Sequence, residues 1–120
     1  MIELDHFNID LDKSNKKQVK EIYKNLEKVL DDILEIKVLR NICRYKHYHI
    51  EVETTFNHDL KDILLYRLIF GDHYERIKND ALRFLKKEYE TFGYMGDRKY
   101  KVTFSNGEKR KIGDYREIKI

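Results

Sequence analysis

The chain of 120 residues contains no proline and only one cysteine. Without proline there is no Pro-rich linker, and no internal repeat is present, so we expect one domain over residues 1–120. The lone Cys43 excludes an intrachain disulfide and a Cys-rich zinc site. No run approaches the roughly 18 apolar residues of a membrane span, and no apolar segment typical of a secretory signal follows Met1. These absences predict a cytoplasmic protein that does not enter membranes.

Charge, by contrast, is abundant and nearly balanced. Charged residues make up 39% of the chain, with 25 basic and 22 acidic side chains, whereas about 25% is usual. Both signs are mixed within periodic apolar segments, which predicts a surface rich in ion pairs, as in thermophilic proteins. Residues 1–35 carry a net charge of −3 and residues 36–120 a net charge of +6. This division is ordinary scatter, or it indicates an acidic metal-binding element beside a basic phosphate-binding surface.

The first half of the chain predicts three strands and one helix. Apolar and polar residues alternate over 6–12, the period of a half-buried strand. Ser14 is expected to cap a helix of about five turns, because apolar residues recur at helical spacing over 19–33. Residues 36–44 are apolar and β-branched, and residues 46–55 alternate cleanly, so each predicts a strand.

The second half predicts two helices and a hairpin. One helix is expected over 60–68 and ends at Gly71, and Asp72 is expected to cap a second helix over 74–89. An Asn-Gly turn predicts a hairpin over 100–112. The core of this order is βαββαβ, an α+β arrangement of the ferredoxin-like or RNA-recognition-motif-like (RRM-like) type. We therefore expect an antiparallel sheet with helices on one face, followed by a C-terminal hairpin.

Two polar clusters are expected to meet on the open face of this sheet, because the first and third strands of such a fold lie side by side at its centre. Asp10 and Asp12 place two carboxylates on one strand face, which suits Mg²⁺ or Mn²⁺ and phosphate-transfer chemistry. The alternative is an exposed strand end. His47 and His49 share the facing strand and are candidate metal or phosphate ligands. Their alternative is an ordinary solvated face.

These clusters resemble motifs of the archaeo-eukaryotic primases. Ile9–Asp12 is similar to the first primase motif, and Arg44–Val52 is similar to the second, in which a strand carries a histidine. The resemblance implies an RRM-like core, Asp10 and Asp12 as catalytic metal ligands, and His49 as a contact to nucleotide phosphate. The small residues that precede the motif-two histidine in primases are missing, and no later strand offers a clear third acid. We therefore expect a reduced relative that binds nucleic acid rather than a full polymerase.

A second resemblance covers more of the chain and implies a fold without an activity. Small proteins of archaea and their mobile elements, for which we know of no assigned function, carry a similar pattern of residues. Its matches here are Tyr48–Ile50, Leu65–Arg67, Gly71–Asp72, Arg76–Ile77 and Asp80.

The same histidines also satisfy the His-hydrophobic-His pattern of the HUH endonucleases, which initiate DNA replication. Tyr74, followed four residues later by Lys78, resembles their nucleophilic tyrosine. That resemblance implies attack of the tyrosyl oxygen on a metal-polarised phosphate. Against this reading, Tyr74 also lies on the apolar stripe of its predicted helix.

A third reading is nucleic-acid binding without catalysis. Tyr45 or Tyr48 would stack on bases, as aromatic residues do on RNA-recognition-motif sheets. Basic residues would contact phosphates, unless they only form a solvated face. A structural or protein-interaction domain is the remaining alternative. The candidate phosphate contacts are Arg40, Arg44, Lys46, Lys99 and Lys101.

Overall fold

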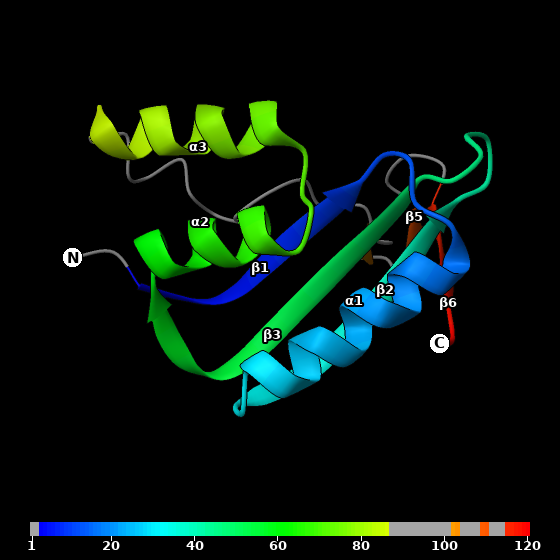
Figure 1. Cartoon of the computed structure of the whole chain (residues 1–120), viewed down its shortest axis with the longest axis horizontal. Coiled ribbons are helices and arrows are strands. Elements are labelled where there is room, and N and C mark those ends of the chain that lie inside the picture. Colours follow the sequence, from blue (N-terminus) through cyan, green and yellow to red (C-terminus); the bar gives the residue numbers. More distant parts are fainter. Residues whose placement is uncertain (1–2, 87–101, 104–108, 111–114) are drawn as a thin grey trace.

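The computed structural model describes residues 3–86, 102–103, 109–110 and 115–120 and confirms an α+β fold (Figure 1). No helix among these residues has both the length and the hydrophobicity needed to cross a membrane. The elements, in chain order, are β1 (Glu3–Leu11), α1 (Lys16–Val29), β2 (Ile33–Asn41), β3 (Tyr48–Asp59), α2 (Leu60–Ile69), α3 (Tyr74–Leu85), β4 (Val102–Thr103), β5 (Lys109–Arg110) and β6 (Tyr115–Ile118).

Four strands form an antiparallel sheet in the order β1-β3-β2-β6. Because β3 lies between β1 and β2, the β1-α1-β2 unit is the split βαβ of ferredoxin-like folds. The predicted pairing of the first and third strands is confirmed, with Asp10 opposite His49. The prediction that β1 lies at the centre of the sheet is wrong within the described strands. β1 is an edge strand, because the fourth strand, β6, pairs with β2 on the other side of the sheet. β4 and β5 pair antiparallel within the predicted hairpin region.

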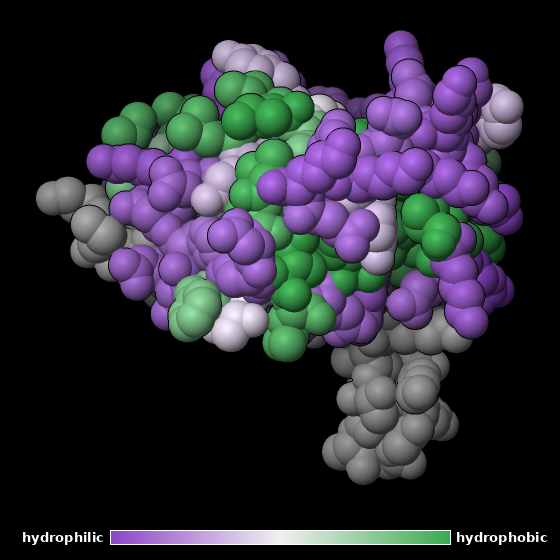
Figure 2. Space-filling model, turned by 60° about the horizontal axis from the view of Figure 1, so that its bottom comes forward, coloured by the Kyte–Doolittle hydropathy of each residue, from purple (hydrophilic) through white to green (hydrophobic). Residues whose placement is uncertain are grey.

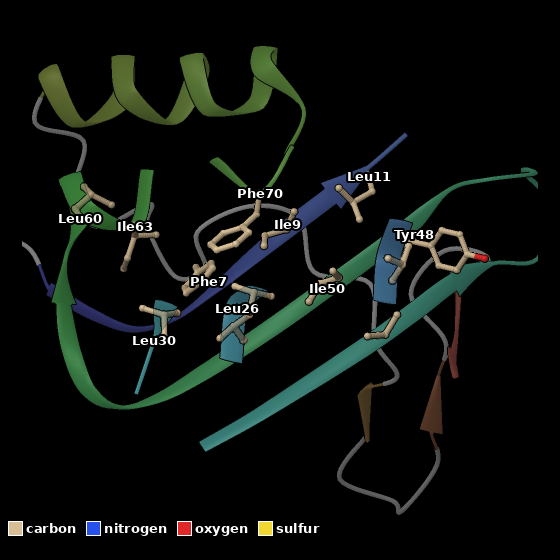
Figure 3. Packing of buried hydrophobic residues seen from close by; sticks show 13 residues of the cluster. Phe7, Ile9, Leu11, Leu26, Leu30, Tyr48, Ile50, Leu60, Ile63 and Phe70 are labelled. Atoms are coloured by element: carbon tan, nitrogen blue, oxygen red, sulfur yellow. The ribbon is translucent and has the colours of Figure 1, made fainter. Parts of the chain in front are cut away.

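The hydrophobic core lies between the sheet and helices α1 and α2 (Figures 1 and 3). Alternation along β1 and β3 directs their apolar side chains to this side, as the sequence predicted. Burying each large apolar side chain contributes about 1.5–3 kcal/mol. The cluster contains Phe7, Ile9, Leu11, Val19, Leu26, Leu30, Val38, Tyr48, Ile50, Val52, Leu60, Ile63 and Phe70.

The ends of α1 differ from the prediction. Asn15, not Ser14, is the N-cap, because its side chain accepts a hydrogen bond from the Gln18 N–H while the Gln18 side chain accepts one from the Asn15 N–H. The helix is shorter than the predicted five turns. Leu30 already has an extended backbone, and Ile33 belongs to β2. The apolar periodicity thus continued from the helix into the strand that follows it.

The turn between α2 and α3 is partly as predicted. Gly71 follows α2 with a φ of 88°, a left-handed conformation that glycine adopts without strain. The N-cap of α3 is His73, so the prediction that Asp72 caps this helix is wrong. The Asp72 carboxylate is instead buried and bonded to other elements, which places the first turn of α3 near β1.

Candidate nucleic-acid interface

Asp10 of β1 and His49 of β3 meet across the two strands, on the face away from the core. His49 Nδ1 lies 3.6 Å from Asp10 Oδ1, and the register places the two residues opposite each other. The predicted convergence of these residues is therefore confirmed. Their surroundings differ from the prediction, because the Asp10 side chain is only 7% exposed and that of His49 is 0% exposed. At this position the sheet face is covered rather than open.

Two residues from distant parts of the chain cover this pair. Arg76 of α3 places Nε 3.1 Å from Asp10 Oδ2, so a guanidinium already partners the carboxylate. The ring of Tyr115 in β6 lies edge-on to His49, with ring centroids 6.0 Å apart. Burial raises the pKa of the Tyr115 hydroxyl, although a hydrogen bond with Asn41 lowers it in part. Asp10 therefore already has a cationic partner in this arrangement.

Asp12, at the end of β1, is more accessible. Its Oδ1 lies 3.4 Å from His47 Nδ1, and its Oδ2 lies 3.2 Å from His73 Nε2. All three side chains are partly exposed. His73 was missed at the sequence level because it lies in a turn far from Asp12 along the chain, and only the tertiary fold brings the two together.

The position of His73 and Arg76 depends on Asp72. Asp72 Oδ1 accepts hydrogen bonds from the backbone N–H of Asp10 (3.0 Å) and of His73 (2.6 Å). Its other oxygen accepts one from Arg67 Nε at 2.5 Å. Burial raises the pKa of Asp72 above the ordinary carboxyl value, while Arg67 acts in the opposite direction. This carboxylate therefore joins β1, α2 and the start of α3.

The predicted divalent-metal ligands do not form a ready site. Among the described residues, no group of three or more His, Cys, Asp or Glu side chains is arranged to hold a metal ion. Glu51 Oε2 is 3.7 Å from His49 Nε2, but His49 is fully buried. The binding of Mg²⁺ or Mn²⁺ by these residues therefore stays a prediction.

A basic groove of about 520 Å³ lies between the start of α1 and the β2–β3 turn. Four cationic side chains line it, and none of the described lining residues is acidic. Three of the four, Arg40, Arg44 and Lys46, are phosphate contacts that the sequence predicted. The full lining is Asn15, Lys16, Arg40, Asn41, Ile42, Cys43, Arg44, Tyr45, Lys46 and Tyr48.

The β2–β3 turn that carries the groove is held by specific hydrogen bonds. Asn41 Oδ1 accepts from the backbone N–H groups of Cys43 and Arg44, each at 2.8 Å. Lys46 has a φ of 64°, and its Nζ lies 5.4 Å from the centre of the Tyr45 ring. Tyr45 is 87% exposed beside these cations. The groove therefore presents an aromatic face together with positive charge.

The other predicted site residues have mixed outcomes. Tyr48 is buried in the core, so the prediction that it stacks on bases is wrong. Tyr74 is exposed at the first position of α3, directly after His73. Lys99 and Lys101 lie outside the described residues.

Comparison of the chain with protein-family models, with curated proteins and with solved structures found no match. The resemblance to primases, to HUH endonucleases and to small archaeal proteins therefore stays a prediction.

Proposed function

We propose that this protein binds single-stranded nucleic acid, DNA or RNA, in the basic groove at the β2–β3 turn. The observation that carries the proposal is the lining of that groove, which combines four cationic side chains with an exposed tyrosine and no acid among the described lining residues. Lysine and arginine neutralise phosphates, and an exposed aromatic ring stacks on unpaired bases. Both contacts are sequence-tolerant, so we expect little base preference.

The residues suit the two parts of a nucleotide. Arg40, Arg44 and Lys46 converge with Lys16 from α1 on one groove, so a bent single strand would contact several of them through its phosphates. Tyr45 is exposed, so its ring can stack on a base, and the ring lies beside the ammonium group of Lys46. The hydrogen bonds that Asn41 Oδ1 accepts fix the turn before binding, which reduces the entropy cost of ordering it.

The two motifs that contain Asp10 and His49 favour binding over catalysis, because both side chains are buried. Asp10 is buried and paired with Arg76, so a catalytic metal would have to displace a guanidinium from it. His49 is fully buried, so of the two histidines in the HUH-like pattern only His47 has an accessible side chain. The proposal therefore assigns no step to Mg²⁺ or Mn²⁺. It describes a primase-like domain that binds nucleic acid without primer synthesis.

Fluorescence anisotropy with a labelled oligothymidylate tests the proposal. For the wild-type protein we expect the logarithm of the binding constant to fall linearly with the logarithm of salt concentration, with a slope of about −0.7 for each phosphate contact. Arg44→Ala should reduce the steepness of that slope by about 0.7, because one phosphate contact is lost. Lys61→Ala is the matched control, because Lys61 is an exposed cation on α2 that does not line the groove. Equal losses in both variants, or no binding at low salt, would overturn the proposal.

Two further outcomes point to an enzyme instead. Primer synthesis that is lost in Asp10→Ala would identify a transferase. Manganese-dependent nicking that leaves the protein attached to DNA, and that is lost in Tyr74→Phe, would identify an endonuclease.

A further inference from the structure

A second groove, of about 510 Å³, lies where α1 ends and β2 begins. Tyr23, Leu30 and Ile33 give it apolar walls. Leu34, which also lines it, is 68% exposed. Figure 2 turns this lower side of Figure 1 forward and shows hydrophobic side chains in a band across the face, bounded by hydrophilic ones. The groove thus combines apolar side chains, among them the exposed Leu34, with polar ones, as protein-binding surfaces do.

The groove adjoins an unpaired sheet edge. β6 pairs with β2 only at Val38–Asn41. On the side away from β3, residues Ile33–Lys37 therefore have no partner strand in the part of the chain that the structure describes. Exposed edges of this kind accept an extended chain as an additional strand, with backbone hydrogen bonds giving affinity and alternate side chains entering pockets.

The charge of the groove lining indicates whether a second copy of this chain or a different partner binds there. Glu27, Asp31 and Glu35 line the groove, none of its described lining residues is cationic, and Lys37 at the end of the edge places its Nζ 4.0 Å from Glu35 Oε1. Two copies of this chain joined edge to edge would bring these carboxylates together, and facing like charges are destabilising. A segment that carries lysine or arginine would instead be complementary to them. The acidic lining thus favours a basic partner over a second copy.

We propose that this groove and the adjoining edge of β2 bind an extended basic peptide segment, in which apolar residues alternate with lysine or arginine. The apolar residues would enter the groove beside Leu34, the basic residues would face Glu27 and Glu35, and the backbone would pair with Ile33–Lys37. This site is separate from the nucleic-acid groove, and neither depends on the other.

The test uses the full chain and a peptide probe of about eight residues in which lysine alternates with valine. Binding is followed by NMR chemical shifts of the Ile33–Lys37 amides. We expect these amides to shift, and we expect Glu27→Lys combined with Glu35→Lys to weaken binding by about tenfold. Glu21→Lys combined with Glu117→Lys is the matched control, because it changes the net charge equally at two exposed residues that do not line the groove. A probe N-methylated at every residue should not bind, because it has no backbone N–H with which to form the ladder.

Several results would overturn the proposal. Equal weakening in the two double variants would mean non-specific attraction. Binding of the N-methylated probe, or of a glutamate-valine probe, would exclude strand addition by a basic segment. The same conclusion follows if no amide shifts at a probe concentration of about 1 mM. A concentration-dependent dimer that Leu34→Lys dissociates would assign the edge to a second copy.

Discussion

Arg67 and Asp72 form a buried ion pair that connects α2 to the turn before α3. Arg67 is fully buried, and its Nε donates to Asp72 Oδ2 at 2.5 Å. Its Nη1 donates to Asp80 of α3 at 2.7 Å, so one guanidinium holds two carboxylates. Through Asp72 the same network reaches the backbone of Asp10 in β1. Removing one member of such a buried group is strongly destabilising, because it leaves a buried charge without its partner.

We expect Arg67→Met to reduce the free energy of unfolding by about 3–5 kcal/mol, because it leaves two buried carboxylates without their cation. Urea unfolding followed by circular dichroism measures the loss. Arg67→Lys should recover only part of it, since an ammonium group cannot reproduce the fixed fork of donors that reaches both acids.

Arg83→Gln is the matched control for Arg67. Arg83 approaches Asp80 at 3.3 Å but has a partly exposed side chain, so we expect a loss of at most about 1 kcal/mol. If the Arg83 and Arg67 variants lost equal stability, the buried network would not be the main support of this region.

Asp32 predicts an acid-sensitive contribution to stability. Its Oδ2 lies 2.8 Å from His58 Nε2, and His58 Nδ1 lies 3.1 Å from the Tyr66 hydroxyl, so the α1–β2 connection is joined to β3 and α2. Burial by itself would raise the pKa of Asp32, but hydrogen bonds with His58 and the Phe56 N–H and the charge of His58 lower it overall. Because the folded pKa lies below the ordinary value of 3.8, this stabilisation is present above that pH and is lost as pH falls through the folded pKa.

Asp32→Asn should therefore cost about 1 kcal/mol near neutral pH and progressively less below about pH 4. Urea unfolding at a series of pH values measures the difference between the two proteins. Asp31→Asn, at the exposed neighbouring position, should change the profile little. A constant difference between wild type and Asp32→Asn across the acid range would contradict the assignment.

Substitutions of Lys46 should affect the stability of the fold and the binding of oligonucleotides differently. Its φ of 64° is left-handed, which costs a residue with a side chain roughly 1–2 kcal/mol, whereas glycine adopts it freely. Glycine also loses more backbone entropy on folding, so Lys46→Gly should stabilise the fold by only about 0.5–1 kcal/mol. It should weaken oligonucleotide binding as Lys46→Ala does, because both remove the cation. If Lys46→Ala were as stabilising as Lys46→Gly, relief of backbone strain would not explain the gain.

Local patterns predicted the elements that bury one regular face. The alternation in β1 and β3 and the periodicity of α1 were sufficient because each pattern records which side of the element meets the core. Asp10 and His49 then came together because the βαββ order fixes their strands as neighbours. The boundary at Ile33 was misassigned because an apolar residue fits both the end of α1 and the start of β2.

Local patterns could not predict that other residues cover Asp10 and His49. An arginine on a helix usually indicates a solvated position, and the burial of Arg67 depends on acids in the next turn and helix. His73 and Arg76 reach β1 only because Asp72 holds the start of α3 there. The pairing of β6 with β2 is likewise non-local, and it brings Tyr115 over His49.

Nucleic-acid binding should be independent of divalent cations if the basic groove carries it. The groove residues are cationic or neutral and attract phosphates directly, whereas the acids Asp10 and Asp12 lie outside the groove lining. We therefore expect the same oligonucleotide affinity in EDTA and in Mn²⁺ at matched ionic strength, and no change in Asp12→Asn beyond about 0.5 kcal/mol. Tyr45→Ala should cost about 1–3 kcal/mol of stacking, and Tyr45→Phe should retain most of it. Affinity that requires Mn²⁺ and disappears in Asp12→Asn would instead indicate that Asp12 binds a divalent metal and that the basic groove alone does not explain binding.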